Sequence, residues 1–418
     1  MPESIRITDL REPRHSEAAL AAFAMIEQVP FDLTVEGVTA AAREECDVPL
    51  FEDNDLRRRL ARYIDAVLAD SHYTRMGRFG TFNSLKRYLI QRSRLEALYA
   101  EHPEIEEIRI ERPLIIAGLP RSGTTHLLNL IGADSRLRAL RRWESQEPYP
   151  SLTVRRGDAP DDRIANGQAG LDQLELLMPL MTNMYDVPND GIHEEVELQH
   201  LCLSSLLMAA GQPVTGWMED YFAEDQRPHY AFLLRALKAL QFLDPKERWV
   251  LKSPQHLAWI PALVETFPDA TIVCTHRDPV AVLTSWITMT VYAARISRDP
   301  IVFEEVIPHA TLLQKCLLDG LVRDRECLPE GRTEHVYFHE FMADDRGTLD
   351  RIYERAGLPM TAGTRAEIDH YIETHPRGRH GKVVYDLEGD FGLDREQLYD
   401  EFADYMAAFP VKREAPNE

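Results

Sequence analysis

PLIIAGLPRSGTTHLLNLI, residues 113–131, is the stretch of sequence that decides the fold. An apolar strand is followed by a turn with two glycines, Gly118 and Gly123, and then by the start of a helix. This order places successive backbone N–H groups and a helix N-terminus around an anion, and the glycines let the backbone approach that anion closely. Three hydroxyl side chains of the turn supply further donors: Ser122, Thr124 and Thr125. The stretch therefore predicts a phosphate-binding loop.

The cation of this loop is Arg121, and its place distinguishes the loop from that of nucleotide hydrolases. The hydrolase pattern GxxxxGK[ST] requires a lysine directly after the second glycine, where this chain has Thr124. The later apolar runs end without an obvious aspartate for a magnesium ion. Because the lysine that spans two phosphates is missing, the loop suits a 5'-phosphate that bears a transferable group.

Four short apolar runs alternate with helical stretches from residue 112 onward: PLIIAG, RWVLKS, ATIVCTH and EHVYF. This alternation predicts an α/β fold in which helices flank a P-loop-type, mostly parallel sheet. The first hundred residues instead show apolar residues at helical spacing and predict an N-terminal helical appendage. That spacing predicts helices over 18–29, 55–70 and 84–102.

The expected domain organisation follows from these patterns. We expect the appendage over residues 1–105, the α/β domain over 106–410 and a frayed tail over 411–418. A long helical insert, at about 134–247, separates the first two apolar runs. Within this insert the spacing predicts helices over 171–185, 196–210 and 229–243. The Met and Leu residues of the insert either pack its helices or line an apolar acceptor pocket.

The composition excludes several classes of partner. The chain has 418 residues, 44% of them hydrophobic and 28% charged, and a formal net charge of −22. This acidity argues against nucleic acid or an anionic membrane as partner, because phosphate neutralisation needs a basic surface. No apolar run is long enough for a membrane span and no secretory signal is evident, so we expect a cytoplasmic protein. Five scattered cysteines without a CxxC pair argue against a zinc site or disulfides. Whether the protein forms a homo-oligomer stays open.

A second candidate anion site follows the apolar run at 270–276. Arg277 comes directly after this run, and Ser285 follows eight residues later on the expected helix. An arginine at the carboxyl end of a strand and a hydroxyl two helical turns on can together bind a phosphate. Alternatively, Arg277 and Asp278 form a local ion pair and the serine is an ordinary helix residue.

The two motifs together resemble those of the superfamily of sulfotransferases that use 3'-phosphoadenosine 5'-phosphosulfate (PAPS), particularly its bacterial members. PRSGTT after an apolar strand looks like the family's 5'-phosphosulfate loop, and Arg277 with Ser285 looks like its 3'-phosphate motif. The resemblance covers about residues 112–410. It implies PAPS as donor without a required metal, and a hydroxyl acceptor that is a small molecule, lipid or glycan. It also implies that the donor is bound by Arg121, Ser122, Gly123, Thr124, Thr125, Arg277 and Ser285.

A basic stretch near the C-terminus, HPRGRHGK at residues 375–382, contrasts with the acidic chain. It resembles the Arg/Lys–Gly lid with which sulfotransferases cover the 3'-phosphate, and the alternative is a surface charge cluster. The residues that the resemblance assigns to the lid are Arg377, Gly378, Arg379 and Lys382.

The expected catalytic groups are a lysine and a base. Lys252 at the end of RWVLKS resembles the family's lysine after the second core strand, which stabilises the departing phosphate. Many family members have a histidine two residues later, but this chain has Pro254 there and His256 beyond it. Other branches use a glutamate, and Glu194 and Glu195 are adjacent carboxylates of which one would have a raised pKa. The base is thus one of these three residues, although two solvated acids at a helix N-terminus would explain the same letters.

Two other functions stay open. A P-loop kinase or other phosphoryl transferase would bind ATP with magnesium, against which the missing lysine counts. A non-catalytic descendant would bind PAP, the desulfonated product of PAPS, without turnover.

Overall fold

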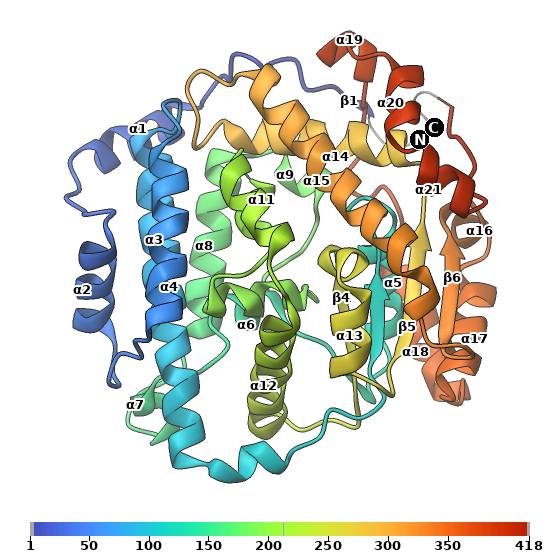
Figure 1. Ribbon diagram of the computed structural model, residues 1–418, viewed down its shortest axis with the longest axis horizontal. Coiled ribbons are helices and arrows are strands. Elements are labelled where there is room, and N and C mark those ends of the chain that lie inside the picture. Colours follow the sequence, from blue (N-terminus) through green and yellow to red (C-terminus); the bar gives the residue numbers. More distant parts are fainter. Residues whose placement is uncertain (1–3, 212, 416–418) are drawn as a thin grey trace.

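A parallel five-stranded sheet forms the centre of the protein in the computed structural model, which describes residues 4–211 and 213–415 (Figure 1). The strand order is β3-β4-β2-β5-β6, and all neighbours pair in parallel. The expected α/β fold and all four expected strands are confirmed. The strands are β2 (Leu114–Ala117), β3 (Leu137–Arg138), β4 (Arg248–Ser253), β5 (Thr271–His276) and β6 (Thr333–Tyr337).

The two faces of the sheet belong to two hydrophobic cores, because successive side chains of a strand point to opposite faces. Leu114 and Ile116 of β2 belong to one core, which α5 (Thr124–Gly132), α17 (Asp345–Ala356) and α18 (Ala362–Thr374) complete. Ile115 and Ala117 belong to the other core, which continues through α13, α14 and α15 into the insert. The helices of this second face are α13 (Ile260–Thr266), α14 (Pro279–Ala294) and α15 (Phe303–Asp324).

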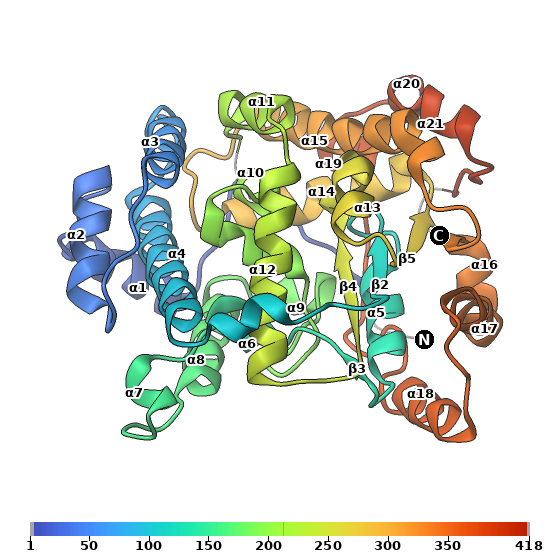
Figure 2. The same cartoon turned by 60° about the horizontal axis from the view of Figure 1, so that its bottom comes forward.

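The expected N-terminal helices are present and pack on the insert. In both views the insert helices α8, α11 and α12 lie between α1–α4 and the sheet (Figures 1 and 2). Leu95 and Leu98 share one core with Leu237 and Leu240, so this region and the insert are packed together. The domain boundaries themselves stay a prediction. The N-terminal helices are α1 (Glu17–Glu27), α2 (Val35–Glu45), α3 (Asn54–Leu68) and α4 (Arg75–Glu101).

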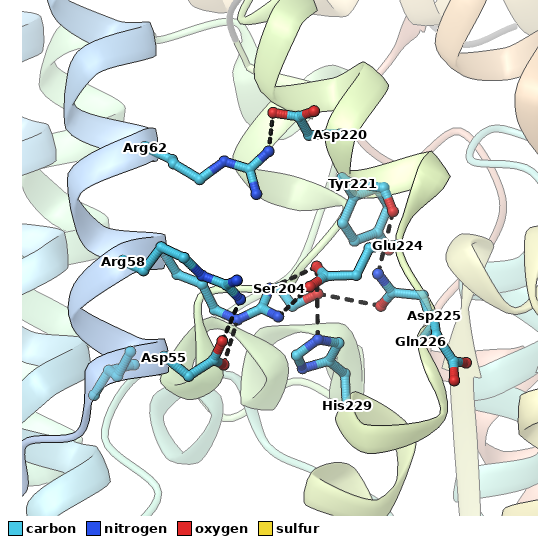
Figure 3. Close-up of polar contacts among 12 residues, drawn as sticks. Asp55, Arg58, Arg62, Ser204, Asp220, Tyr221, Glu224, Asp225, Gln226 and His229 are labelled. Atoms are coloured by element: carbon cyan, nitrogen blue, oxygen red, sulfur yellow. Dashed lines mark hydrogen bonds and ion pairs between the residues drawn. The ribbon is translucent and has the colours of Figure 1, made fainter.

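A partly buried ion pair also joins the N-terminal helices to the insert (Figure 3). Arg59 of α3 donates to both carboxylate oxygens of Glu224, and its Nε donates to Asp55 at 2.8 Å. Glu224 follows α11 (Thr215–Ala223), and its carboxylate lies 3.8 Å from His229 on α12 (Arg227–Leu243). Burial and the nearby Arg59 charge lower the pKa of His229 to about 4, so this imidazole is neutral in the fold at neutral pH.

Two helices expected in the insert are broken, whereas α12 agrees with the expectation. The helix expected over 171–185 is wrong: α8 (Arg163–Leu177) stops before Met178, because Pro179 disfavours helical backbone at the residue before it. The helix expected over 196–210 is wrong as well. There a 3-10 segment, η2 (Glu195–Cys202), ends at Leu203 with φ 51°. The hydroxyl of Ser205 then bonds to the carbonyl of Val196 at 3.0 Å, which competes with helical hydrogen bonding.

A second, two-stranded sheet ties the start of the chain to the basic stretch. β1 (Ser4–Ile5) pairs in parallel with β7 (Lys382–Val383). Along the described ranges, no helix is sufficiently long and apolar to cross a membrane. The remaining elements are η1 (Pro103–Glu107), α6 (Arg142–Gln146), α7 (Leu152–Arg155), α9 (Met181–Met184), α10 (Leu207–Ala210), η3 (Pro254–Ala258), η4 (Arg325–Cys327), α16 (Phe338–Ala343), α19 (Leu387–Phe391), α20 (Arg395–Glu401) and α21 (Ala403–Ala408).

Candidate active site

The expected phosphate loop connects β2 to α5 at the carboxyl edge of the sheet. A Cβ atom at Gly118 would lie 1.8 Å from Oγ1 of Thr275, so only glycine fits between the loop and β5. Gly123 is the N-cap of α5 with φ 85°, and Arg121 also has a positive φ, 68°. The loop is thus bent sharply at two points beside the positive end of α5.

The three hydroxyl groups of the loop have different environments. Ser122 is buried, and its Oγ donates to the carbonyl of Leu119 at 2.7 Å and lies 2.8 Å from Oγ1 of Thr275. Thr124 is buried at the start of α5, whereas Thr125 lines an open cavity. Ser122 therefore shapes the loop, and Thr125 is the hydroxyl residue that faces a ligand space.

Arg121 joins the two motifs that the sequence places far apart. Its Nε donates to Oγ of Ser285 at 2.9 Å, and its Nη2 donates to the hydroxyl of Tyr385 at 2.9 Å. Its carbonyl oxygen accepts a hydrogen bond from Nη1 of Arg277 at 2.7 Å. The phosphate loop and the Arg277 motif thus meet at one edge of the sheet. No local pattern indicated Tyr385, which follows the basic stretch.

Arg277 binds a carboxylate in the structure. Its Nε and Nη2 each donate to one oxygen of Glu414 at 2.7 Å, and its guanidinium lies over the ring of Phe338 at 3.9 Å. The backbone N–H of Glu414 donates to Asp278 at 2.6 Å, so the expectation of a frayed end is wrong at this residue. A planar fork that holds two oxygens of an anion is also the geometry for a phosphate. Around it lies a cavity of about 510 Å³, here named the arginine cavity, lined by Arg121, Arg277, Ser285, Lys382, Arg395 and Glu414.

The four expected catalytic residues lie together beside β2. Lys252 is the partner of Ile116 in the sheet, and its Nζ forms an ion pair with Glu194. The backbone N–H of Lys252 donates to Glu195 at 2.6 Å, and the other oxygen of Glu195 lies 2.7 Å from Nε2 of His256. Glu195 and His256 are 0% exposed, whereas the Glu194 side chain is 13% exposed.

Two tyrosines lie beside this group, Tyr230 next to His256 and Tyr185 near Glu194. Nδ1 of His256 lies 2.8 Å from the hydroxyl of Tyr230, so both ring nitrogens of this histidine have partners. Tyr185 is partly buried near Glu194, and desolvation together with this carboxylate raises the pKa of its phenol well above the usual range. The sequence signalled neither tyrosine, because each is remote along the chain from the lysine run.

The basic stretch is held by carboxylates. Arg377 forms an ion pair with Asp345 and donates to the carbonyl of Met342 at 3.1 Å. Arg379 donates to Asp186 at 3.0 Å, and Nε2 of His380 lies 2.8 Å from the same carboxylate. The stretch borders a cavity of about 680 Å³ in front of the phosphate loop, here named the loop cavity, whose lining includes Arg121, Thr125, His126, Asp186, Gly378 and Arg379.

A second cavity of about 680 Å³, here named the apolar cavity, shares a wall with the loop cavity. The shared wall contains Tyr185, Asp186 and Arg379. The apolar part of the remaining wall comes mainly from α8, α9, the turn between them and α14, and polar residues of α6, of η2 and of the segment before η2 complete it. The apolar part includes Leu171, Leu174, Met178, Met181, Trp286 and Met289.

Comparison with known proteins assigns the family. The family model for the sulfotransferase family matches residues 113–362. Sulfotransferase STF9 from Mycobacterium avium is 28% identical, with a TM-score of 0.80 over 93% of this chain and 100% of that chain. Sulfotransferase STF1 from Mycobacterium tuberculosis H37Rv is 25% identical, with a TM-score of 0.76 over 88% of this chain and 98% of that chain. No curated protein sequence matches the chain. Because the family model matches more than half of its residues, the chain belongs to the sulfotransferase family.

Proposed function

We propose that the protein transfers a sulfonate group from PAPS to a hydroxyl group of a small-molecule, lipid or glycan acceptor, in the cytoplasm. The observation that carries the proposal is the hydrogen bond from Arg277 to the carbonyl of Arg121. It brings two anion-binding groups together at the carboxyl ends of β2 and β5, which suits a nucleotide with two separate phosphates. The absence of a lysine after Gly123 favours PAPS over ATP.

The assignment of donor contacts follows from the two groups. The loop from Arg121 to Thr125 surrounds the 5'-phosphosulfate with its backbone N–H groups and the start of α5. Arg277 and Ser285 bind the 3'-phosphate, which takes the place of the Glu414 carboxylate in the arginine fork. Among the basic residues expected in the lid, Lys382 lines the arginine cavity and helps to bind the 3'-phosphate. Arg379 instead forms the wall between the loop and apolar cavities, and Arg377 stabilises the stretch through Asp345.

Glu194 is the general base of this proposal. Glu195 and His256 are fully buried and bonded to each other, so they position Lys252 through its backbone N–H. Glu194 accepts the proton of the acceptor hydroxyl while that oxygen bonds to sulfur and the bond from sulfur to the 5'-phosphate oxygen breaks. The ammonium group of Lys252 then leaves its ion pair with Glu194, donates to the departing oxygen and stabilises the negative charge on that oxygen. PAP and the sulfonated acceptor leave.

The test is a calorimetric titration with PAP and with ATP–magnesium. We expect PAP to bind and ATP–magnesium to bind far more weakly. Arg277→Met should weaken PAP binding about tenfold to hundredfold, because charge-assisted hydrogen bonds are lost. Arg365→Met, which removes an exposed arginine paired with Asp350, is the control.

Turnover with labelled PAPS and a panel of phenols, sterols, glycolipids and sugars then tests transfer itself. Tight binding of ATP–magnesium without PAP binding would overturn the proposal in favour of a phosphoryl transferase. PAP binding without transfer to any acceptor would favour the non-catalytic alternative.

A further inference from the structure

The apolar cavity contains buried polar atoms without partners. Four atoms of the described residues that line this cavity are buried and make no hydrogen bond: Nδ1 of His193, Oγ1 of Thr290, Nη1 of Arg142 and Oδ1 of Asn189. His193 is 8% exposed and Thr290 is 5% exposed. An unpaired buried polar group destabilises a fold by about 1–3 kcal/mol, so four such groups around one cavity indicate a ligand that supplies partners for them.

The hydroxyl of Thr290 lacks the hydrogen bond that other threonines of α14 make. Thr284 and Thr288 donate to the carbonyl groups four residues earlier, at 2.7 and 2.9 Å. Thr290 has the same opportunity on the same helix, yet its hydroxyl makes no such bond. Its hydroxyl is therefore available to a molecule in the cavity.

Arg142 is the arginine of this cavity that has no ion pair, although the carboxylates of Glu175 and Glu197 also line the cavity. Arg379, the other arginine of the wall, pairs with Asp186, and Glu197 pairs with His200 at 3.0 Å. In the part of the chain that the structure describes, Arg142 forms no side-chain hydrogen bond or ion pair, and burial lowers the pKa of its guanidinium. A planar guanidinium without a partner suits a carboxylate, which accepts two parallel hydrogen bonds from it.

His193 lies beside the proposed base, whereas Arg142 lies on the paired neighbouring segment. The backbone N–H of Arg142 donates to the carbonyl of Gly191 at 2.9 Å, and that of His193 donates to Leu140 at 2.8 Å. His193 directly precedes Glu194, and burial lowers the pKa of its imidazole, which leaves Nδ1 able to hydrogen-bond with a neutral hydroxyl. The two side chains thus give the cavity a hydroxyl-binding group and an anion-binding group.

We propose that the apolar cavity binds the acceptor as an amphipathic hydroxy acid, with its carboxylate at Arg142, its apolar body against the Met and Trp side chains, and its hydroxyl near His193. The inference rests on the proposed function for the identity of the site, and it adds the chemical class of the acceptor. Cavities of this size hold a drug-sized molecule and are lined mostly by apolar groups with few polar contacts.

The experiment measures equilibrium binding to the full chain saturated with PAP, without turnover. The probes are ω-hydroxylaurate and lithocholate, each compared with its methyl ester, which keeps the apolar body and the hydroxyl but removes the negative charge. We expect at least one acid to bind about tenfold to hundredfold more tightly than its ester. In Arg142→Met the acid should bind as weakly as the ester, whereas Thr290→Val should weaken both severalfold.

Arg141→Met is the matched control. Arg141 is the adjacent arginine, it donates to the carbonyl of Asp190 at 3.0 Å, and it lines the loop cavity instead of the apolar one. This variant should keep the preference for the acid. PAP affinity and the thermal unfolding midpoint of each variant show that its fold is intact.

Equal binding of acid and ester, binding of neither, or an unchanged preference in Arg142→Met would overturn the inference. Failure of the proposed function is recognised separately, because it would appear as absent PAP binding or absent sulfonate transfer. Binding of the acid in a charge-dependent way without any sulfonate transfer would leave the cavity assignment standing and refute the function.

Discussion

Replacement of Glu414 by glutamine should strengthen PAP binding. The Glu414 carboxylate holds Arg277 with two hydrogen bonds of 2.7 Å, and both side chains are 18% exposed. A bidentate pair with this exposure contributes about 1 kcal/mol. The 3'-phosphate needs the same guanidinium, so the observed PAP affinity is reduced by the fraction of molecules in which Glu414 occupies it. Removal of about 1 kcal/mol of competition should lower the Kd for PAP about fivefold.

Glu414→Gln is a clean perturbation because the segment keeps its other contacts. The backbone N–H of Glu414 still donates to Asp278, and Arg395 still donates to its carbonyl at 3.1 Å. Calorimetric titration with PAP measures the change, and Glu401→Gln removes the same charge from an exposed position of α20 as a control. An unchanged or weaker PAP affinity in Glu414→Gln, relative to this control, would refute the competition argument.

Three further predictions concern the base, the loop and the pH dependence of stability. Glu194→Gln should lower kcat by about 10²–10⁴-fold in a labelled-PAPS assay while the Kd for PAP stays unchanged, and full activity would exclude Glu194 as the base. Gly118→Ala should weaken PAP binding by more than about tenfold, because its Cβ would lie 1.8 Å from the Thr275 hydroxyl, and the double variant with Thr275→Ala should regain part of the affinity. His229 has a folded-state pKa of about 4, below its unfolded value, so the unfolded chain binds more protons and stability falls as pH is lowered from about 6.5 towards 4. Urea unfolding at several pH values should show a smaller loss in His229→Gln, and an identical loss would contradict the assignment.

The features that could be predicted from the sequence are those with local patterns. β2 and the loop from Gly118 to Thr125 are contiguous, so apolar run, glycines and hydroxyls appear in order within one stretch. Arg277 was predicted for the same reason, because it follows its own strand directly. The end of α8 before Pro179 could also have been predicted, because proline disfavours helical backbone at the residue before it. The helix was instead predicted from the spacing of its apolar residues.

The rest depends on contacts between distant residues. Glu414 and Tyr385 reach Arg277 and Arg121 only after the whole fold has formed, and no local pattern marks either of them. Glu194 and Glu195 are neighbours in sequence, yet one forms an ion pair near the loop and the other is enclosed with His256. Burial, which separates their roles, comes from tertiary packing and cannot be deduced from two identical letters.

The pairing of β1 with β7 has a consequence for how the protein is made. Ser4 and Ile5 leave the ribosome long before their hydrogen-bonding partners, Lys382 and Val383, are synthesised. At usual elongation rates the first segment stays unpaired for on the order of half a minute. Lys382 lines the arginine cavity and Ser4 borders it, so this wall forms only after Lys382 has been synthesised. A nascent chain that stalls before residue 382 therefore lacks a closed arginine cavity, however complete its central sheet is.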